Sequence, residues 1–296
     1  MQSRAFRLAQ RAVHAARDRI DAMATRMLGR DFEERIDKVQ RYAGESGIDP
    51  FGLDPGWAKY AIGVAALFHR AWFRTEVIGI ERVPRGRVLL VANHSGQIPI
   101  DAMVIGAALF LDAAEPRVVR SMVEKWVQTL PFVSLAFQRV GQILGTPDNA
   151  RRLLALGEAL LVFPEGVRGI SKPFHQRYQL APFGHGFMRL ALEMDTPIVP
   201  IAVIGAEEQY VSLGNLDGVA KLFRVPSVPL IPQLLLPGGQ LPLPVKYKIV
   251  FGEPLRFEGD HDDDDAAIGE KVAVVRSAIE RMLEDGLKRR RSIFFG

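Results

Sequence analysis

The chain has 296 residues, of which 48% are hydrophobic and 24% charged, with no cysteine and a formal net charge of +4. This composition excludes a disordered chain and a disulfide-built scaffold. The length suits one large domain. Because there is no cysteine, thiol catalysis, thiolate zinc sites and iron–sulfur clusters are also excluded. A mean hydropathy of +0.06 is high for a soluble protein and low for a multi-span membrane protein, which favours a protein that works at a membrane surface.

Residues 1–43 are predicted to form a basic, amphipathic helix. Its apolar residues recur at helical spacing: Phe6, Val13, Ile20, Met23 and Met27. Arginines occupy the other faces, so the helix either packs on the rest of the protein or docks on anionic lipid. Because the chain has no run of about 20 apolar residues, and no apolar core follows the first arginines, the sequence predicts neither a membrane-spanning helix nor a secretory signal.

Residues 44–56 contain Gly, Asp and Pro and are predicted to be a linker. A second helix is predicted over 57–74, and its aromatic residues form either an interfacial belt or part of the core: Trp57, Tyr60, Phe68, Trp72 and Phe73. We therefore divide the chain into an N-terminal helical, membrane-docking segment over residues 1–56 and a second domain over residues 57–296.

From residue 75 onward, short apolar runs alternate with helical patterns. Strands are predicted over 76–80, 88–92, 117–123, 159–163, 198–204 and 245–251. Helices are predicted over 101–111, 127–138, 149–157, 187–194 and 264–290, the last capped by the acidic run before it. The alternation predicts an α/β fold, a single domain with a central, mostly buried, mixed β-sheet flanked by helices.

The segment over residues 225–245 interrupts this pattern. It carries no charged residue, is rich in leucine, and its prolines forbid a helix. It is either an extended segment wrapped over the core or a loop that dips into a membrane or covers an acyl chain.

Polar residues follow the predicted buried strand 88–92. His94 comes at its end, and Asp101 lies seven positions later. An imidazole oriented by a carboxylate is a general-base arrangement that can deprotonate a hydroxyl group. On spacing alone, an ordinary structural pair is the favoured interpretation of the two residues.

A second block, residues 163–169, follows the predicted buried strand 159–163. Its Glu165 and Arg168 suit the binding of a polyol and an anionic group, and its glycines allow a ligand to approach the backbone. Ligands bind at the carboxyl ends of strands in open α/β sheets, so the two blocks together indicate one site.

These blocks resemble the glycerolipid acyltransferase family of the lysophosphatidate acyltransferase type, over about residues 77–254. The chain offers the family's blocks in order: Asn93-His94…Asp101, a middle block from Pro131-Phe132 to Gly141, Phe163-Pro164-Glu165-Gly166-Val167-Arg168, and Ile198-Val199-Pro200-Ile201. The stretch from Phe183 to Pro200 is also similar to the monoacylglycerol and diacylglycerol acyltransferase branch.

The sequence departs from the family pattern at two places. Six residues lie between His94 and Asp101, where the family usually has four, so the loop must bulge to return Asp101 to the imidazole. Pro147 occupies the position of an arginine that the family associates with the acceptor's phosphate, which leaves Arg168 as the matching basic residue.

The resemblance implies direct transfer of a fatty acyl group from acyl-CoA or acyl carrier protein to a hydroxyl of a glycerolipid, such as a lysophospholipid or a mono- or diacylglycerol. It implies His94 and Asp101 as the catalytic pair. The substrate-binding residues are expected to be Phe163, Pro164, Glu165, Gly166 and Arg168, with Ser95 and Gly96 placed to offer backbone donors to the oxyanion. No metal and no cofactor besides the acyl donor is expected.

The expected location is the cytoplasmic face of a membrane, with a lipid surface as partner. No nucleic-acid motif is present, and the oligomeric state is not predicted. Two alternatives remain at this level: a catalytically silent lipid-binding or lipid-transfer protein on the same scaffold, and a lipid hydrolase, although the chain lacks a Gly-x-Ser-x-Gly elbow.

Several residues outside these blocks also have polar or basic side chains. The acidic run 260–265 is expected to cap a helix rather than to bind calcium, because it lacks the spacing of a calcium loop. His14, His69, His175 and His185 are expected to be structural. Lys172 and Arg177 either meet a phosphate or CoA, or belong to a solvated face. The basic and apolar C-terminus, 288–295, suits anionic lipid or is a frayed tail.

Overall fold

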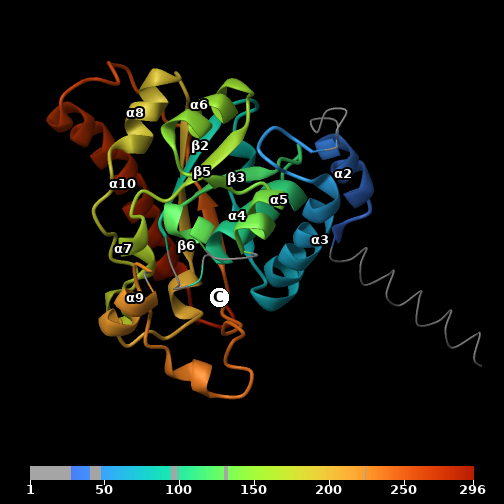
Figure 1. The fold of residues 1–296 in the computed structure, drawn as a ribbon, viewed down its shortest axis with the longest axis vertical. Helices are drawn as coiled ribbons and strands as arrows, with labels where there is room; N and C mark the ends of the chain where they lie inside the picture. Colours follow the sequence, from blue (N-terminus) through green and yellow to red (C-terminus); the bar gives the residue numbers. More distant parts are fainter. Residues whose placement is uncertain (1–27, 41–47, 95–97, 99, 130–132, 224) are drawn as a thin grey trace, which may run out of the picture.

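A computed structural model describes residues 28–40, 48–94, 98, 100–129, 133–223 and 225–296, and these form an α/β domain (Figure 1). Its strands are β1 (Glu76–Ile78), β2 (Val88–Ala92), β3 (Val119–Val123), β4 (Ile143–Leu144), β5 (Ala159–Val162), β6 (Ile198–Ile204) and β7 (Lys248–Phe251). Its α-helices are α2 (Phe32–Gln40), α3 (Pro55–Ala66), α4 (Ile100–Leu111), α5 (Val133–Arg139), α6 (Pro147–Ala155), α7 (Val167–Ile170), α8 (Gly186–Glu193), α9 (Asp217–Phe223) and α10 (Asp265–Arg289). Shorter helical turns are η1 (Leu67–Trp72), η2 (Ile80–Arg82), η3 (Lys125–Thr129), η4 (Phe174–Gln176), η5 (Ala206–Glu208) and η6 (Pro232–Leu235).

The seven strands form one mixed sheet in the order β1-β7-β6-β2-β5-β3-β4. Neighbouring strands run parallel except for the antiparallel pair β6 and β7. This confirms the predicted α/β class with a mixed central sheet. Every residue of β2, β5 and β6 is buried, as expected for uncharged strands covered on both faces.

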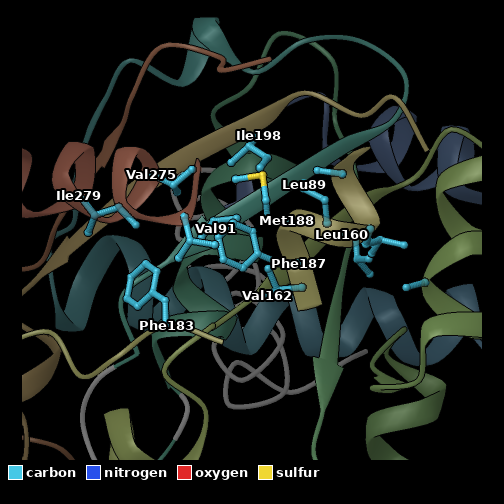
Figure 2. Close-up of a cluster of buried hydrophobic side chains, with 14 of the residues drawn as sticks. Leu89, Val91, Leu160, Val162, Phe183, Phe187, Met188, Ile198, Val275 and Ile279 are labelled. Carbon is cyan, nitrogen blue, oxygen red and sulfur yellow. The ribbon is translucent and has the colours of Figure 1, made fainter. Parts of the chain in front are cut away.

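Alternate side chains of β2 enter two different cores. Leu89 and Val91 join the cluster drawn in Figure 2, where Phe187 and Met188 of α8 and Val275 and Ile279 of α10 cover them. Val88, Leu90 and Ala92 face Val104, Ile105 and Leu109 of α4 on the other side. The sheet is therefore a layer between α6, α8 and α10 on one face and α4 on the other.

Helices α2 and α3 lie outside α4 and share a third apolar cluster with it. Phe32 of α2 meets Phe110 of α4 edge-on, with ring centroids 6.0 Å apart. Asp49 and Arg120 form a buried ion pair between the segment before α3 and β3. The described part of the predicted N-terminal segment thus packs on the domain, and the predicted boundary at residue 56 stays a prediction.

Capping residues set the starts of two helices. Asp54 accepts hydrogen bonds from the backbone N–H groups of Gly56 and Trp57 at the start of α3. Asp264 accepts one from Ala267 and begins α10, which confirms the predicted capping role of the acidic run.

Some predicted elements were wrong in detail. The helix predicted over 127–138 is divided between η3 and α5, and the helix predicted over 57–74 ends as α3 and continues as the π-helical turn η1. Strand β1 ends at Ile78, because Gly79 adopts a left-handed conformation with φ of 76°. The short elements β4, α7 and α9 were not predicted, because too few residues carry their pattern. Residues 1–27 of the predicted first helix lie outside the described residues.

No helix within the described ranges combines the length and the apolarity that crossing a bilayer requires.

Candidate active site

The register of the parallel strands places three loops at one edge of the sheet. Val91 of β2 pairs with Val162 of β5, and Ala92 of β2 pairs with Ile201 of β6. The segments that follow these strands begin at residues 93, 163 and 205. This is the edge at which open α/β sheets bind their ligands.

Asn93 fixes the start of the first loop. It is fully buried; its Nδ2 donates to the carbonyl of Val203 (3.1 Å), and its Oδ1 accepts from the backbone N–H of Val203 (2.7 Å). The NH2 and the C=O of the Asn93 side chain are therefore both hydrogen-bonded to β6, which fixes the direction in which the chain leaves β2.

The structure brings His94 and Asp101 together, as the sequence predicts. Nδ1 of His94 lies 2.9 Å from Oδ2 of Asp101. Asp101 is fully buried in the first turn of α4, and its Oδ1 accepts from the backbone N–H of Ala102 (2.8 Å). A carboxylate only accepts hydrogen bonds, so Nδ1 carries the proton and Nε2 is the ring nitrogen with a lone pair. The catalytic role of the pair stays a prediction.

Phe163 and Gly169 both pack against His94. The ring of Phe163 stacks on it with centroids 4.0 Å apart and planes 20° apart. A Cβ at Gly169 would lie 2.8 Å from Cβ of His94 and 3.0 Å from Cβ of Glu165. Only glycine allows this approach, so the glycine-containing block serves the packing of His94.

Glu165 is buried, and both its oxygens accept hydrogen bonds from the protein. Oε1 accepts from the backbone N–H of His94 (2.9 Å), and Oε2 accepts from the backbone N–H of Ala181 (2.7 Å) and lies 3.4 Å from Nζ of Lys172. The predicted contact of Glu165 with an acceptor stays a prediction, but its observed contacts hold the loops together.

The other predicted substrate-binding residues are placed differently from one another. Arg168 is exposed on α7, and its Nη2 donates to the carbonyl of Pro182 (3.0 Å). The carbonyl of Pro164 accepts from Gly184, and Gly166 takes a left-handed φ of 57°. Ser95 and Gly96, the predicted oxyanion donors, lie outside the described residues, as do Pro131 and Phe132 of the middle block.

Sequence reasoning missed Glu207, Glu208 and Gln209, which follow β6 at the same edge. Nε2 of Gln209 donates to the carbonyl of Ile98 (3.3 Å), and Oε1 of Gln209 accepts from the hydroxyl of Tyr247 (2.7 Å). Glu208 forms a two-point ion pair with Arg290. A signal was present: two adjacent carboxylates come shortly after a fully apolar strand, as His94 and Glu165 come shortly after theirs.

Glu207 faces Lys172. Oε1 of Glu207 lies 3.2 Å from Nζ of Lys172, which also donates to the carbonyl of Gln179 (3.0 Å). Burial raises the pKa of Glu207 to about 7, although the charge of Lys172 opposes the rise. Lys172 is thus a buried partner of two carboxylates, whereas Arg177 is exposed and lies over the ring of Phe174 at 4.5 Å.

A second His–Asp pair lies at the opposite end of α4. Nε2 of buried His69 is 2.7 Å from Oδ2 of Asp112. Burial disfavours ionisation of Asp112, but the hydrogen bond from His69 and the charges of His69 and Arg70 outweigh it and lower its pKa. About 17 Å of helix separates this pair from Asp101, so it fixes η1 to α4, as the structural interpretation of His69 predicts.

The acidic segment before α10 groups Asp260, His261 and Asp262, whose candidate ligand atoms lie within 4.8 Å of one another. Asp260 and Asp262 are exposed, and Oδ1 of Asp260 accepts from the backbone N–H of Asp262 (2.9 Å). This contact belongs to the turn that precedes the helix. We therefore assign no metal to this cluster.

Comparisons with known proteins extend the pattern. The family model described as Acyltransferase matches residues 74–204. An uncharacterized protein of Mycobacterium tuberculosis strain H37Rv is 38% identical over 265 residues, which cover 87% of this chain and 74% of the relative. A human protein named DGAT1/2-independent enzyme synthesizing storage lipids is 27% identical over 208 residues, covering 69% of this chain and 60% of the relative.

The fold has a solved counterpart. The crystal structure of the 1-acyl-sn-glycerophosphate acyltransferase PlsC from Thermotoga maritima matches with a TM-score of 0.53 and 18% identity, over 90% of this chain and 86% of that chain. The likeness concerns the fold, while the matched family model includes both blocks that carry His94, Asp101 and Glu165. The chain belongs to the acyltransferase family that this model describes.

Proposed function

We propose that the protein transfers a fatty acyl group from acyl-CoA or acyl carrier protein to a hydroxyl of a glycerolipid. The observation that carries this proposal is the His94–Asp101 pair at the ligand-binding edge of the sheet, with Nδ1 of His94 2.9 Å from Oδ2 of Asp101. Because Nδ1 is engaged by a buried carboxylate, Nε2 is the nitrogen that serves as base.

The reaction needs one proton acceptor and one oxyanion site. Nε2 of His94 takes the proton of the acceptor hydroxyl while its oxygen attacks the thioester carbonyl. The carbon–sulfur bond then breaks, and the departing thiolate takes the proton from the imidazolium. Ser95 and Gly96 are proposed as backbone donors to the oxyanion. These steps require no covalent enzyme intermediate, no metal and no cofactor besides the acyl donor.

For the acceptor, the proposal covers lysophospholipids and mono- or diacylglycerols. Pro147 begins α6 at the position where the family's arginine is expected. Arg168, exposed on α7 at the edge of the site, is the matching basic residue for a phosphate. The likeness to the human storage-lipid enzyme favours a neutral glycerolipid.

We further propose that the protein works on a membrane surface, through an apolar rim formed by α3 and the segment 213–241. Trp57, Tyr60 and Val64 of α3 and Leu67, the first residue of η1, recur at helical spacing and have exposed fractions of 44–78%. The exposed leucines of the other segment include Leu222, Leu235 and Leu236. Exposed apolar side chains gathered in this way are typical of docking surfaces.

A hydrogen bond links the residues that follow the two parts of the apolar rim. Nε1 of Trp72, at the end of η1, donates to the carbonyl of Pro242 (3.0 Å). The hydroxyl of Tyr210, after β6, donates to the carbonyl of Gln240 (2.7 Å). In Figure 1, α9 and the orange segment after it form the lower end of the molecule, and α3 descends toward that end on the other side. The predicted extended segment 225–245 is therefore hydrogen-bonded to the domain near its end, at residues 240 and 242, and exposes leucines at 235 and 236.

A catalytically silent lipid-binding protein is the alternative. The intact geometry of His94 and Asp101 favours the enzyme, because lipid binding alone does not require a base with an oriented tautomer. The test is transfer of labelled acyl groups from acyl-CoA and acyl carrier protein to lysophosphatidate, monoacylglycerol and diacylglycerol in liposomes. Product formation that His94→Ala abolishes supports the proposal. The absence of transfer by the wild-type protein to every acceptor from both donors refutes it.

A further inference from the structure

We propose that Glu207 is a positioning residue for His94, and that its ionised carboxylate acts through Lys172 and Glu165 on the backbone of the catalytic loop. This inference rests on the proposed acyl transfer, in which His94 is the base. It assigns a role to a residue that lies outside the four blocks that resemble the family.

One chain of polar contacts connects the three loops at the carboxyl edge of the sheet. Oε1 of Glu207 lies 3.2 Å from Nζ of Lys172, which lies 3.4 Å from Oε2 of Glu165. Oε1 of Glu165 accepts the backbone N–H of His94 at 2.9 Å. Glu207 follows β6, Glu165 follows β5 and His94 follows β2. Lys172 thus joins two loops, and Glu165 joins the third.

The contacts are shielded from solvent. The exposed fractions of the side chains of Glu165, Glu207 and Lys172 are 0%, 5% and 8%. Charges in such surroundings interact more strongly than at the surface, so each group depends on its partners for its position. Lys172 and Glu207 also line a cavity of about 10 Å³, which holds roughly one water molecule and no substrate. Glu207 therefore acts through Lys172 and does not touch the reacting atoms.

The position of His94 has two separate determinants. Asp101 and Phe163 orient its ring, whereas Glu165 is a hydrogen-bond partner of its backbone N–H. A more negative carboxylate accepts a stronger hydrogen bond. When Glu207 is ionised, its carboxylate competes with Glu165 for the ammonium group of Lys172. Lys172 then neutralises Glu165 less, so Glu165 accepts a stronger hydrogen bond from the backbone N–H of His94.

Ionisation of Glu207 makes this dependence visible in pH. Burial raises the pKa of Glu207 to about 7, while Lys172 and a hydrogen bond from the backbone N–H of Tyr178 lower it and Glu165 raises it. The neighbouring carboxylate, Glu208, faces Arg290 and Arg177 instead. The ionised, positioning state of Glu207 is therefore present above a pH of about 7 and lost below it.

The test compares wild type with Glu207→Gln, which keeps the shape of the side chain and removes its ionisation. The ratio of wild-type to variant kcat is measured from below to above neutral pH. We expect it to be close to one in acid and to rise to about tenfold or more in base, with KM changed less than about twofold. Taking the ratio at each pH removes the pH dependence that the wild-type protein and the variant share. Glu208→Gln is the matched control, and its ratio to wild type is expected to be constant with pH.

A ratio that does not change with pH overturns the proposal, because a merely structural loss acts equally at every pH. A control variant that reproduces the rise overturns it as well. If the wild-type protein transfers no acyl group, the proposed function fails. The contact between Glu207 and Lys172, here called the bridge, is then tested by its effect on stability instead of on activity. Lys172→Met and Glu207→Gln are then combined in a double-mutant cycle of urea unfolding. We expect Glu207→Gln to restore stability lost in Lys172→Met, and simple additivity refutes the bridge.

Discussion

Nδ1 of His94 and Oδ2 of Asp101 lie 2.9 Å apart although six residues separate the two along the chain. Asp101 lies in the first turn of α4, which begins at Ile100, and its carboxylate reaches the imidazole from there. The widened spacing therefore changes the length of the loop without separating the pair. A hydrogen bond to a buried carboxylate fixes the ring, which is the requirement for a base that deprotonates an alcohol.

Removing the base is expected to remove the activity. His94→Ala and Asp101→Asn should each lower kcat by about 10²–10⁴-fold, because the first eliminates the proton acceptor and the second replaces an acceptor-only carboxylate by an amide that no longer fixes the tautomer. The effect is measured as the rate at which labelled acyl groups are transferred to acceptor lipids in liposomes.

The second His–Asp pair supplies the control for this experiment. His69→Ala breaks the hydrogen bond to Asp112 at the far end of α4. It should lower the free energy of unfolding by about 1–3 kcal/mol and leave kcat of the folded protein within about twofold of wild type. Equal losses of kcat in His69→Ala and His94→Ala would contradict the assignment of His94 as base.

Gly169→Ala is expected to displace the catalytic loop. The added Cβ would lie 2.8 Å from Cβ of His94 and 3.0 Å from the carbonyl oxygen of His94. We expect a loss of about 1–3 kcal/mol in stability and of roughly tenfold or more in kcat, measured by urea unfolding and by the transfer assay.

Gly106→Ala is the matched helical control. It lies in α4, and an added Cβ would meet no atom within 4 Å. It should stabilise the protein by about 0.5–1 kcal/mol, because alanine loses less conformational entropy on helix formation. A Gly169→Ala variant that behaves like Gly106→Ala would disprove the steric argument.

The ionisation of Glu207 should also appear in stability. Burial raises the pKa of Glu207 in the folded protein to about 7, from an ordinary value of 4.5. The folded state therefore keeps this proton up to a higher pH than the unfolded state does. The resulting contribution to the free energy of unfolding is fully present below pH 4.5 and is lost as the pH rises through about 7. Relative to Glu207→Gln, the wild-type protein should lose roughly 3 kcal/mol of unfolding free energy across this interval.

Urea unfolding of both proteins at the two ends of the interval measures this difference. Glu208→Gln should retain the pH dependence of the wild-type protein, because Glu208 is held by Arg290. Parallel curves for wild type and Glu207→Gln would show that burial does not shift the pKa of Glu207.

The exposed leucines of the apolar rim should govern membrane binding. Burying one leucine in an apolar phase contributes about 1.5–3 kcal/mol, so Leu235→Glu should weaken binding to liposomes about tenfold or more in a flotation assay. Leu156→Glu is the control: Leu156 is similarly exposed, at 63%, but caps α6 at the opposite end of the molecule. Undiminished recovery of Leu235→Glu with liposomes would exclude this surface.

The sequence by itself determined the elements whose pattern is long and strong. The uncharged runs of β2, β5 and β6 predict buried strands, and polar residues at their ends predict where the site lies. His94 and Glu165 were found in this way, since each comes shortly after a buried run. Short elements such as β4 and α7 were missed, because two to four residues carry no periodicity.

Only the tertiary structure decided what the polar groups contact. Glu165 and His94 are 71 positions apart, and Lys172 and Glu207 are 35 apart, so no local pattern records either contact. Their meeting depends on the order and register of the strands, which bring β2, β5 and β6 side by side. Burial among these loops then raises the pKa of Glu207, because neighbouring parts of the chain exclude water from its carboxylate.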